Sequence, residues 1–352
     1  MKLLIITQKY DINDSNLGAF IDWWDKLAEK MEHVYILALE KKSEPIKSNV
    51  EVISMGKEVG RCFFGKIFGF YFGLFKTIGK TDAILVHMIP KYVILAAPVA
   101  FIFRKPVYMW YTGVSAHWQL KFAVKLCKKV FTAHEAAMRV NTPKRIITGH
   151  GIDVEKFKIH DLRVKSNGPI TILSVGRITA SKGHDLIINI MADLIKLGYD
   201  LKLKIIGGVI QGYHQKYLKS LKKLSEDLKI NEAIEFSGPV SYEKMPAYLE
   251  KSEILINAVP FGGLDKVVLE AMASGVIPLT SNNAFLNVFP QEISQHLVFK
   301  INDTEDLKNK LKNILDKKFY KDEHLRSEIR NIVVKNHNLD SLTLKITEEM
   351  KK

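Results

Sequence analysis

The chain has 352 residues and a formal charge of +14, from 52 Lys and Arg against 38 Asp and Glu. At about 150 residues per domain this length predicts two domains. A composition of 47% hydrophobic and 26% charged residues excludes disorder and fibrous classes. The two cysteines, Cys62 and Cys127, are too few for a disulfide framework or a zinc site, which favours a reducing compartment.

Short apolar runs alternate with helix-length segments from the start of the chain. The strands predicted in the first half are residues 3–7, 34–39, 50–53, 83–86, 107–110, 129–132 and 145–148, with helices at 20–31 and 117–127. The longest apolar run, 92–103, contains Pro98 and falls short of the ~18 residues of a membrane span, so it predicts a buried helix.

The same alternation restarts after a polar stretch at residues 158–169. Strands are predicted at 170–175, 201–206, 234–237, 254–257 and 277–280, with a helix at 186–197. Strands alternating with helices indicate parallel sheets covered on both faces. The pattern predicts two doubly wound domains with a cleft, and ligands should lie beyond the carboxyl ends of the strands.

The positive charge is concentrated in the first half. Residues 60–145 contain 14 Lys and Arg but only Asp82 and Glu135 as acids, which implies an anionic partner: nucleic acid, anionic lipid or a phosphorylated substrate. Residues 61–80 hold six phenylalanines and no acid, a pattern typical of a helix at a membrane interface. The alternative is a helix that covers its own sheet. A second basic stripe is predicted at Lys121, Lys125, Lys128 and Lys129.

Two segments of the second half have the pattern of a ligand site. In 174–190 a strand ends at Gly176, and a loop with Arg177 and Lys182 leads into a helix, so the two cations can grip a diphosphate. The alternative is a pair of solvated loop charges. In 257–282 a glycine loop leads into a helix from about Asp265, whose carboxylate can cap it. Glu270 on this helix can accept hydrogen bonds from a ribose diol, or else faces solvent.

With the glycine turn of 147–157, these segments resemble the group 1 family of retaining, nucleotide-sugar-dependent glycosyltransferases with the GT-B fold, over most of the chain. The resemblance implies an α/β fold of two doubly wound Rossmann-like parallel-sheet domains facing each other across a cleft. Residues 1–160 would form the acceptor-binding domain and 161–335 the nucleotide-sugar donor-binding domain. Residues 336–352 would form a C-terminal helix that crosses back to the first domain.

The resemblance also assigns donor-site roles by position. Arg177 and Lys182 match the diphosphate grips and act as catalytic cations, and Glu270 matches the ribose-binding glutamate. The remaining donor-binding positions are Gly18, Gly176, Gly207, Gly208, Gly262, Gly263 and Leu264. Gly262 stands where the family has the first glutamate of its E-x7-E motif, so the backbone amides of 262–264 or the carboxylate of Asp265 would have to serve instead.

The candidates in the first domain come from the ends of its predicted strands. Gly18 lies in a loop whose amides would face donor phosphate or acceptor, and His87 is the third catalytic candidate, with a buried structural role as its alternative. His117, His134 and Glu135 are candidate contacts to acceptor or sugar, with an ordinary surface histidine as the alternative at 117.

The predicted activity is that of a retaining hexosyltransferase using a UDP- or GDP-sugar as co-substrate, without a cofactor or metal. The expected acceptor is phosphorylated or lipid-linked, such as a membrane lipid-linked saccharide or another cell-envelope glycan. We expect a cytoplasmic protein that binds peripherally to the anionic inner face of the cell membrane. The alternatives are a catalytically impaired GT-B relative and a basic nucleic-acid-binding protein. The sequence contains no helix-turn-helix, zinc or RNP pattern that would support the second alternative.

Overall fold

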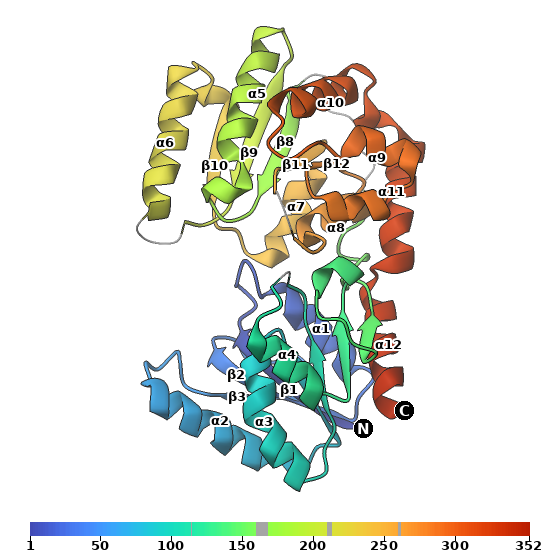
Figure 1. Cartoon of the computed structure of the whole chain (residues 1–352). Helices are drawn as coiled ribbons and strands as arrows, with labels where there is room; N and C mark the ends of the chain where they lie inside the picture. Colours follow the sequence, from blue (N-terminus) through green and yellow to red (C-terminus); the bar gives the residue numbers. More distant parts are fainter. Residues whose placement is uncertain (114, 160–167, 210–212, 260–261) are drawn as a thin grey trace. The chain divides into compact units, whose positions relative to one another are not determined.

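The computed structural model of the chain describes residues 1–113, 115–159, 168–209, 213–259 and 262–352 (Figure 1). These residues form two compact units. Unit 1 comprises Met1–Asp153, Ser241–Glu243 and Asn336–Lys352, and unit 2 comprises Val154–Val240 and Lys244–Lys335. Most of the predicted polar connection, 160–167, lies outside the described residues.

Unit 1 is built on a seven-stranded parallel sheet with the order β3-β2-β1-β4-β5-β6-β7. Successive residues of its central strands point to opposite faces and are buried on both, which explains their continuous apolar sequences. The strands are β1 (Lys2–Tyr10), β2 (His33–Lys41), β3 (Val50–Ser54), β4 (Ala83–His87), β5 (Val107–Trp110), β6 (Lys129–Thr132) and β7 (Arg145–Ile147).

Helices cover both faces of this sheet. Helices α1 (Ala19–Ala28) and α12 (Leu339–Lys351) pack on one face, with Trp23, Leu27 and Leu342 in the shared core. Helices α2 (Phe63–Ile78), α3 (Pro90–Ile102) and α4 (Trp118–Leu126) pack on the other. Figure 1 shows α2 and α3 side by side, with α4 next to α3.

Unit 2 has a five-stranded parallel sheet with the order β10-β9-β8-β11-β12. Its strands are β8 (Ile170–Val175), β9 (Leu201–Ile206), β10 (Ile234–Gly238), β11 (Ile254–Asn257) and β12 (Ile277–Thr280). Its helices are α5 (His184–Lys196), α6 (Tyr213–Asp227), α7 (Met245–Glu250), α8 (Lys266–Ala273), α9 (Gln291–Leu297), α10 (Thr304–Asp316) and α11 (Glu323–Asn336).

The two sheets share one topological feature that locates the sites. In each, the strand order reverses beside the first strand, between β1 and β4 in unit 1 and between β8 and β11 in unit 2. Open α/β sheets bind their ligands beyond the carboxyl ends of the strands at this switch point. The predicted alternation of parallel strands and helices is confirmed.

One predicted helix differs from expectation in its burial. Residues 92–103 form most of α3, but Phe101 and Ile102 at its end are exposed, so the helix is buried only along part of its length. In the described part of the chain, no helix combines the length and the apolarity that crossing a bilayer would require.

Candidate active site

The carboxyl ends of β8 and β9 meet at Gly176 and Gly207. A Cβ built on Gly207 would lie 1.7 Å from the carbonyl oxygen of Gly176, so only glycine fits where the two strands end. Gly183 has a left-handed φ of 61° and its Cβ position is 2.8 Å from Ala258, the residue after β11. These contacts bring the loop after β8 against the ends of β9 and β11. Gly208 continues this link, because its carbonyl accepts from the amide of Ile178 at 3.0 Å.

Lys182 lies over this glycine junction. Its Cε is 3.1 Å from the Cβ position of Gly176, so the side chain folds back along the loop and is half-buried. Arg177, on the same loop, is exposed. The structure therefore places one cation against the switch point of unit 2 and leaves the second at the surface beside it.

Asp265, in the loop before α8, interacts electrostatically with Lys182. Its Oδ2 accepts from Asn282 Nδ2 at 2.9 Å, and the same amide group donates to the carbonyl of Gly263 at 2.8 Å. Burial raises the pKa of the Asp265 carboxyl, while the positive charge of Lys182 and the bond from Asn282 oppose that rise. The predicted capping bond is wrong: Asp265 stands at the N-cap of α8, but its side chain bonds Asn282 instead of the helix amides.

The start of α8 completes the site of unit 2. Glu270 is 4% exposed, which excludes the solvent-facing alternative, and its Oε1 lies 3.8 Å from Lys266 Nζ. Within the described residues, the amides of Gly263 and Leu264 donate no hydrogen bond. Amides before a helix N-terminus attract anions. The loop thus offers donors where Gly262 replaces the expected glutamate.

His184 belongs to this site and was not predicted from the sequence. It begins α5, is buried, and its Nδ1 lies 3.2 Å from Ser174 Oγ on β8. Burial lowers its pKa to about 4, partly opposed by a hydrogen bond with the backbone of Arg177. His184 therefore connects β8, the cation loop and α5 as a neutral imidazole. In the sequence, its position directly after Lys182 and Gly183 is the only feature that could have indicated that His184 belongs to the site.

In unit 1, His87 lies at the end of β4 within an aromatic cluster. It is 1% exposed, its Nδ1 is 3.1 Å from Thr7 Oγ1, and its ring is 4.1 Å from Phe20 and 5.1 Å from Trp24, centre to centre. The next residue, Met88, has a φ of 66°, and the amide of Ile89 donates to the His87 carbonyl at 2.8 Å. This burial favours the structural role of His87; a catalytic role stays a prediction.

The loop before Gly18 uses its amides internally. Asp14 accepts from Asn16 and Leu17 through Oδ1, and its carbonyl accepts from the amide of Gly18 at 3.1 Å. Lys9 fixes the loop through ion pairs to Asp11 and Asp14 at 3.0 and 2.6 Å. The amide of Gly18 is therefore engaged within the loop, and a role of Gly18 in donor binding stays a prediction.

The other candidates of unit 1 cap short helices. Nδ1 of His117 accepts from the amide of Leu120 at 3.0 Å, which caps α4, and Nδ1 of His134 accepts from Ala136 at 3.2 Å, which caps the turn 135–137. Glu135 is exposed beside it. Any contact of these three residues with acceptor or sugar stays a prediction.

An exposed apolar and basic surface covers the outer side of α2, α3 and α4. On α2, Phe70 and Leu74 are buried in the core of unit 1, but a stripe at positions 64, 68, 72 and 75 faces outward. We call the following side chains the docking face: Phe64, Phe68, Phe72, Phe75, Phe101, Ile102 and Phe122, with the cations Lys76, Lys80, Arg104, Lys105, Lys121, Lys125 and Lys128 around them. The helix at 61–80 therefore both covers the sheet and exposes aromatic rings.

One member of the predicted basic stripe does not belong to this face. Lys129 is half-buried and forms an ion pair with Glu349 of α12. Lys144 also turns inward, where its Nζ donates to the carbonyls of Lys125 and Cys127 at the end of α4. The exposed stripe on α4 and just after it consists of Lys121, Lys125 and Lys128.

A family model described as "Glycosyl transferases group 1" matches residues 155–332. This match covers half of the chain, and the chain belongs to that family. It includes the cation loop after β8, the loop before α8 and Glu270. The resemblance seen in the sequence is thereby confirmed.

Curated relatives match a shorter segment. The chain is 31% identical over 139 residues to the GDP-Man:Man(3)GlcNAc(2)-PP-Dol alpha-1,2-mannosyltransferase of Caenorhabditis elegans, covering 37% of this chain and 30% of that protein. It is 27% identical over 160 residues to the alpha-monoglucosyldiacylglycerol synthase of Streptococcus pneumoniae, covering 42% and 35% respectively. The matches span about a third of the length of these relatives.

Solved structures match the whole fold. HepE of Anabaena in complex with UDP has a TM-score of 0.77 at 14% identity, with 100% of both chains covered. The sucrose-phosphate synthase of Thermosynechococcus elongatus has a TM-score of 0.74 at 14% identity, covering 99% of this chain and 98% of that one. The fold is that of the GT-B glycosyltransferases, as predicted.

Proposed function

We propose that the protein is a retaining hexosyltransferase that moves a sugar from a UDP- or GDP-sugar to a lipid-linked acceptor at an anionic membrane surface. The observation that carries the proposal is the arrangement at the switch point of unit 2. There, Lys182 lies over the Gly176–Gly207 junction and interacts electrostatically with Asp265. A half-buried cation beside a glycine-lined strand end is suited to a diphosphate held close to the backbone.

In this site the diphosphate is the leaving group. As the bond between the sugar and the diphosphate breaks, negative charge grows on the departing phosphate, and Lys182 and Arg177 neutralise it. The open amides of Gly263 and Leu264 supply further donors at the N-terminus of α8. Glu270 accepts from the ribose hydroxyls, which orients the nucleoside. The new bond joins the acceptor oxygen to the anomeric carbon on the face that the diphosphate leaves, without a protein nucleophile. The proton of the acceptor hydroxyl passes to the departing diphosphate as its O–H bond breaks.

The similar proteins support both nucleotides and favour a lipid. One relative's name specifies GDP-Man, and the HepE structure contains UDP. The names of the two relatives also include lipid groups, PP-Dol in one and diacylglycerol in the other. The docking face presents aromatic rings and positively charged side chains, a combination that binds anionic bilayers. We also propose that the protein is cytoplasmic and peripheral to the membrane, and that the transfer needs no metal.

The donor is tested by a panel of UDP- and GDP-sugars scored by thermal stabilisation of the intact protein. A bound donor at 100 times its dissociation constant adds about 2.7 kcal/mol to the free energy of unfolding. Retention is tested by the anomeric configuration of the first product formed from the stabilising donor, followed by NMR. An inverted product would contradict retention, and stabilisation by no nucleotide sugar would contradict the donor site.

A further inference from the structure

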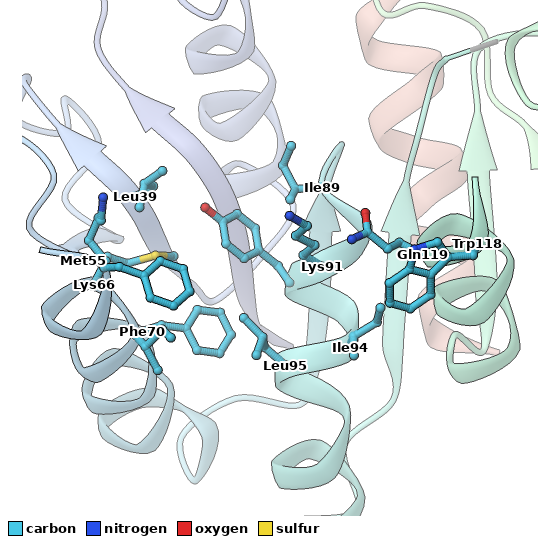
Figure 2. Close-up of a pocket in the computed structure, with 13 residues that line it drawn as sticks. Leu39, Met55, Lys66, Phe70, Ile89, Lys91, Ile94, Leu95, Trp118 and Gln119 are labelled. Atoms are coloured by element: carbon cyan, nitrogen blue, oxygen red, sulfur yellow. The ribbon is translucent and has the colours of Figure 1, made fainter. Parts of the chain in front are cut away.

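An apolar groove lies between α2, α3 and the start of α4 in unit 1 (Figure 2). Its volume is about 460 Å3, within the range of roughly 300–1,000 Å3 typical of small-molecule sites. Its walls are hydrocarbon for the most part, and Phe70, Ile94 and Leu95 contribute to them. The lining therefore fits a hydrophobic ligand better than a sugar or a nucleotide.

The groove reaches the ligand-binding edge of the sheet. Leu39 lies near the carboxyl end of β2, Met55 follows β3 directly, and Ile89 follows β4 by two residues. These residues line the groove, so it opens where parallel strands present their ligands. A molecule with its apolar part in the groove would have its polar end at this edge.

Two cations line the groove. Lys66 of α2 and Lys91 of α3 both contribute to its wall, and no described carboxylate forms an ion pair with either of them. Figure 2 shows both side chains along the groove, with Trp118 near Ile94. The docking face lies on the same three helices, and its residues are outside the lining of the groove. An anionic lipid matches both the lining and the charge.

We propose that this groove holds the hydrocarbon chain of the acceptor lipid while Lys66 and Lys91 hold a phosphate in its head group. This assignment rests on the proposed function, because it takes the acceptor to be a lipid and places it at the ligand-binding edge of unit 1. It specifies the acceptor as a lipid with one hydrocarbon chain and a phosphate. It also places that hydrocarbon chain in unit 1, partly withdrawn from the bilayer. Neutral lipids and free phosphate are the competing ligands.

The probe is decyl phosphate, kept below its micelle concentration so that no membrane is present. Trp118 lines the groove and is exposed, whereas Trp23, Trp24 and Trp110 are buried, so a change in tryptophan fluorescence should come from Trp118 and be absent in Trp118→Phe. We expect saturable binding of decyl phosphate and about fifteenfold weaker binding of octyl phosphate, at about fourfold per methylene. Inorganic phosphate should give no change.

Variants separate the groove from the docking face. Ile94→Glu places a charge in the wall and should abolish decyl phosphate binding, while Lys66→Gln and Lys91→Gln should each weaken it by about tenfold without affecting 1-decanol. Phe68→Ser, on the docking face and outside the groove, is the matched control and should bind decyl phosphate normally. Melting temperatures, together with normal nucleotide binding, show that each variant is folded.

Three results would overturn the groove assignment: equal affinity for octyl and decyl phosphate, unchanged binding in Ile94→Glu, or no binding up to the micelle concentration. The proposed function fails on other measurements, because it requires that UDP or GDP bind unit 2 and that the protein bind anionic vesicles. Nucleotide binding without decyl phosphate binding would reject the groove alone. Decyl phosphate binding without nucleotide binding would reject the transferase and leave a lipid site.

Discussion

At the residue scale, Lys182 and Arg177 carry the proposed chemistry. We expect Lys182→Ala and Arg177→Ala each to reduce transfer by roughly 100- to 1,000-fold, which is about 2.7–4 kcal/mol in the activation barrier. Both side chains lie on a loop outside the core, so the melting temperature should change little. The matched control is Lys196→Ala at the far end of α5, which should transfer normally. Near-native turnover in Lys182→Ala would reject the diphosphate role.

Glu270 should act mainly on binding. Glu270→Gln keeps the shape of this buried side chain but should weaken the proposed bonds to the ribose hydroxyls, which would be alike in the ground and transition states. We therefore expect the KM for the donor to rise more than kcat falls, because uniform binding affects KM. Steady-state kinetics at varied donor concentration measures this split. A collapse of kcat at constant KM would place Glu270 at the reacting sugar instead.

His184 should make the protein sensitive to acid. Its pKa is about 4 in the folded protein because it is buried, against about 6.5 for an unfolded histidine. The unfolded chain therefore binds the proton first, and stability present above pH 6.5 is lost as the pH falls from 6.5 toward 4. The loss amounts to about 3 kcal/mol at ~1.4 kcal/mol per pH unit.

Urea unfolding of the wild type and His184→Gln at pH 7.5, 6 and 5 measures this effect. The variant should lose less free energy of unfolding across this series than the wild type, although it starts from a lower value because the bond to Ser174 is altered. Identical pH dependence in the two proteins would show that His184 does not titrate as its burial implies. His337 in unit 1, with a pKa of about 4, should contribute in the same direction in both proteins.

At the element scale, α2 has two faces with different expected roles. Replacing Phe68, Phe72 and Phe75 with Ser should abolish sedimentation with phosphatidylglycerol vesicles while leaving the melting temperature nearly unchanged, since these rings are 71%, 60% and 58% exposed. The matched control is Phe70→Ser on the buried face, which should destabilise unit 1 by about 3–5 kcal/mol.

Salt should weaken the same vesicle binding. Each cation near an anionic surface contributes about 1 kcal/mol, and the Debye length falls from about 10 Å at 0.1 M salt to about 3 Å at 1 M. Neutral phosphatidylcholine vesicles should bind far less protein. Equal binding to both kinds of vesicle, or binding to neither, would remove electrostatic docking from the account.

The elements could be predicted largely from the sequence, because parallel strands buried on both faces are continuous apolar runs. β8 (Ile170–Val175), β9 and β11 have the predicted bounds. Burial of individual side chains could not be predicted in the same way. The six phenylalanines of 61–80 divide between core and surface, because the 3.6-residue period turns Phe70 inward and Phe68 and Phe72 outward. The sequence alone left both alternatives open: the buried rings confirm that the helix covers its sheet, and the membrane interface stays a prediction.

The site could be predicted only where a motif carries it. Arg177, Lys182 and Glu270 were found from spacing and resemblance, whereas the bond of Asn282 to Asp265 joins residues 17 positions apart and depends on the packing of β12 beside β11. His134 was predicted as a contact because it follows a strand, and His117 because it lies near a position where the family carries a histidine. The structure shows that each caps a helix or turn, and their contacts stay predictions. Local sequence does not distinguish a capping histidine from one that faces a ligand.

At the scale of the whole molecule, each unit has a switch point with its own set of groups. Unit 2 holds cations, loop amides and a buried glutamate at the proposed nucleotide-sugar site, and unit 1 holds the apolar groove and the basic outer face proposed to bind a lipid. The charge distribution follows this division, because the excess of cations lies in the first half of the chain. The account therefore requires that the nucleotide bind unit 2 specifically.

Calorimetric titration of the intact protein with UDP and GDP tests this requirement most directly. We predict one saturable site for one of the two nucleotides, weakened at least tenfold in Lys182→Ala and in Arg177→Ala but unchanged in Lys196→Ala. Binding of an oligonucleotide with no heat from either nucleotide would contradict the account and favour a basic nucleic-acid-binding protein. Nucleotide binding that persists unchanged in Lys182→Ala would contradict the site proposed in unit 2.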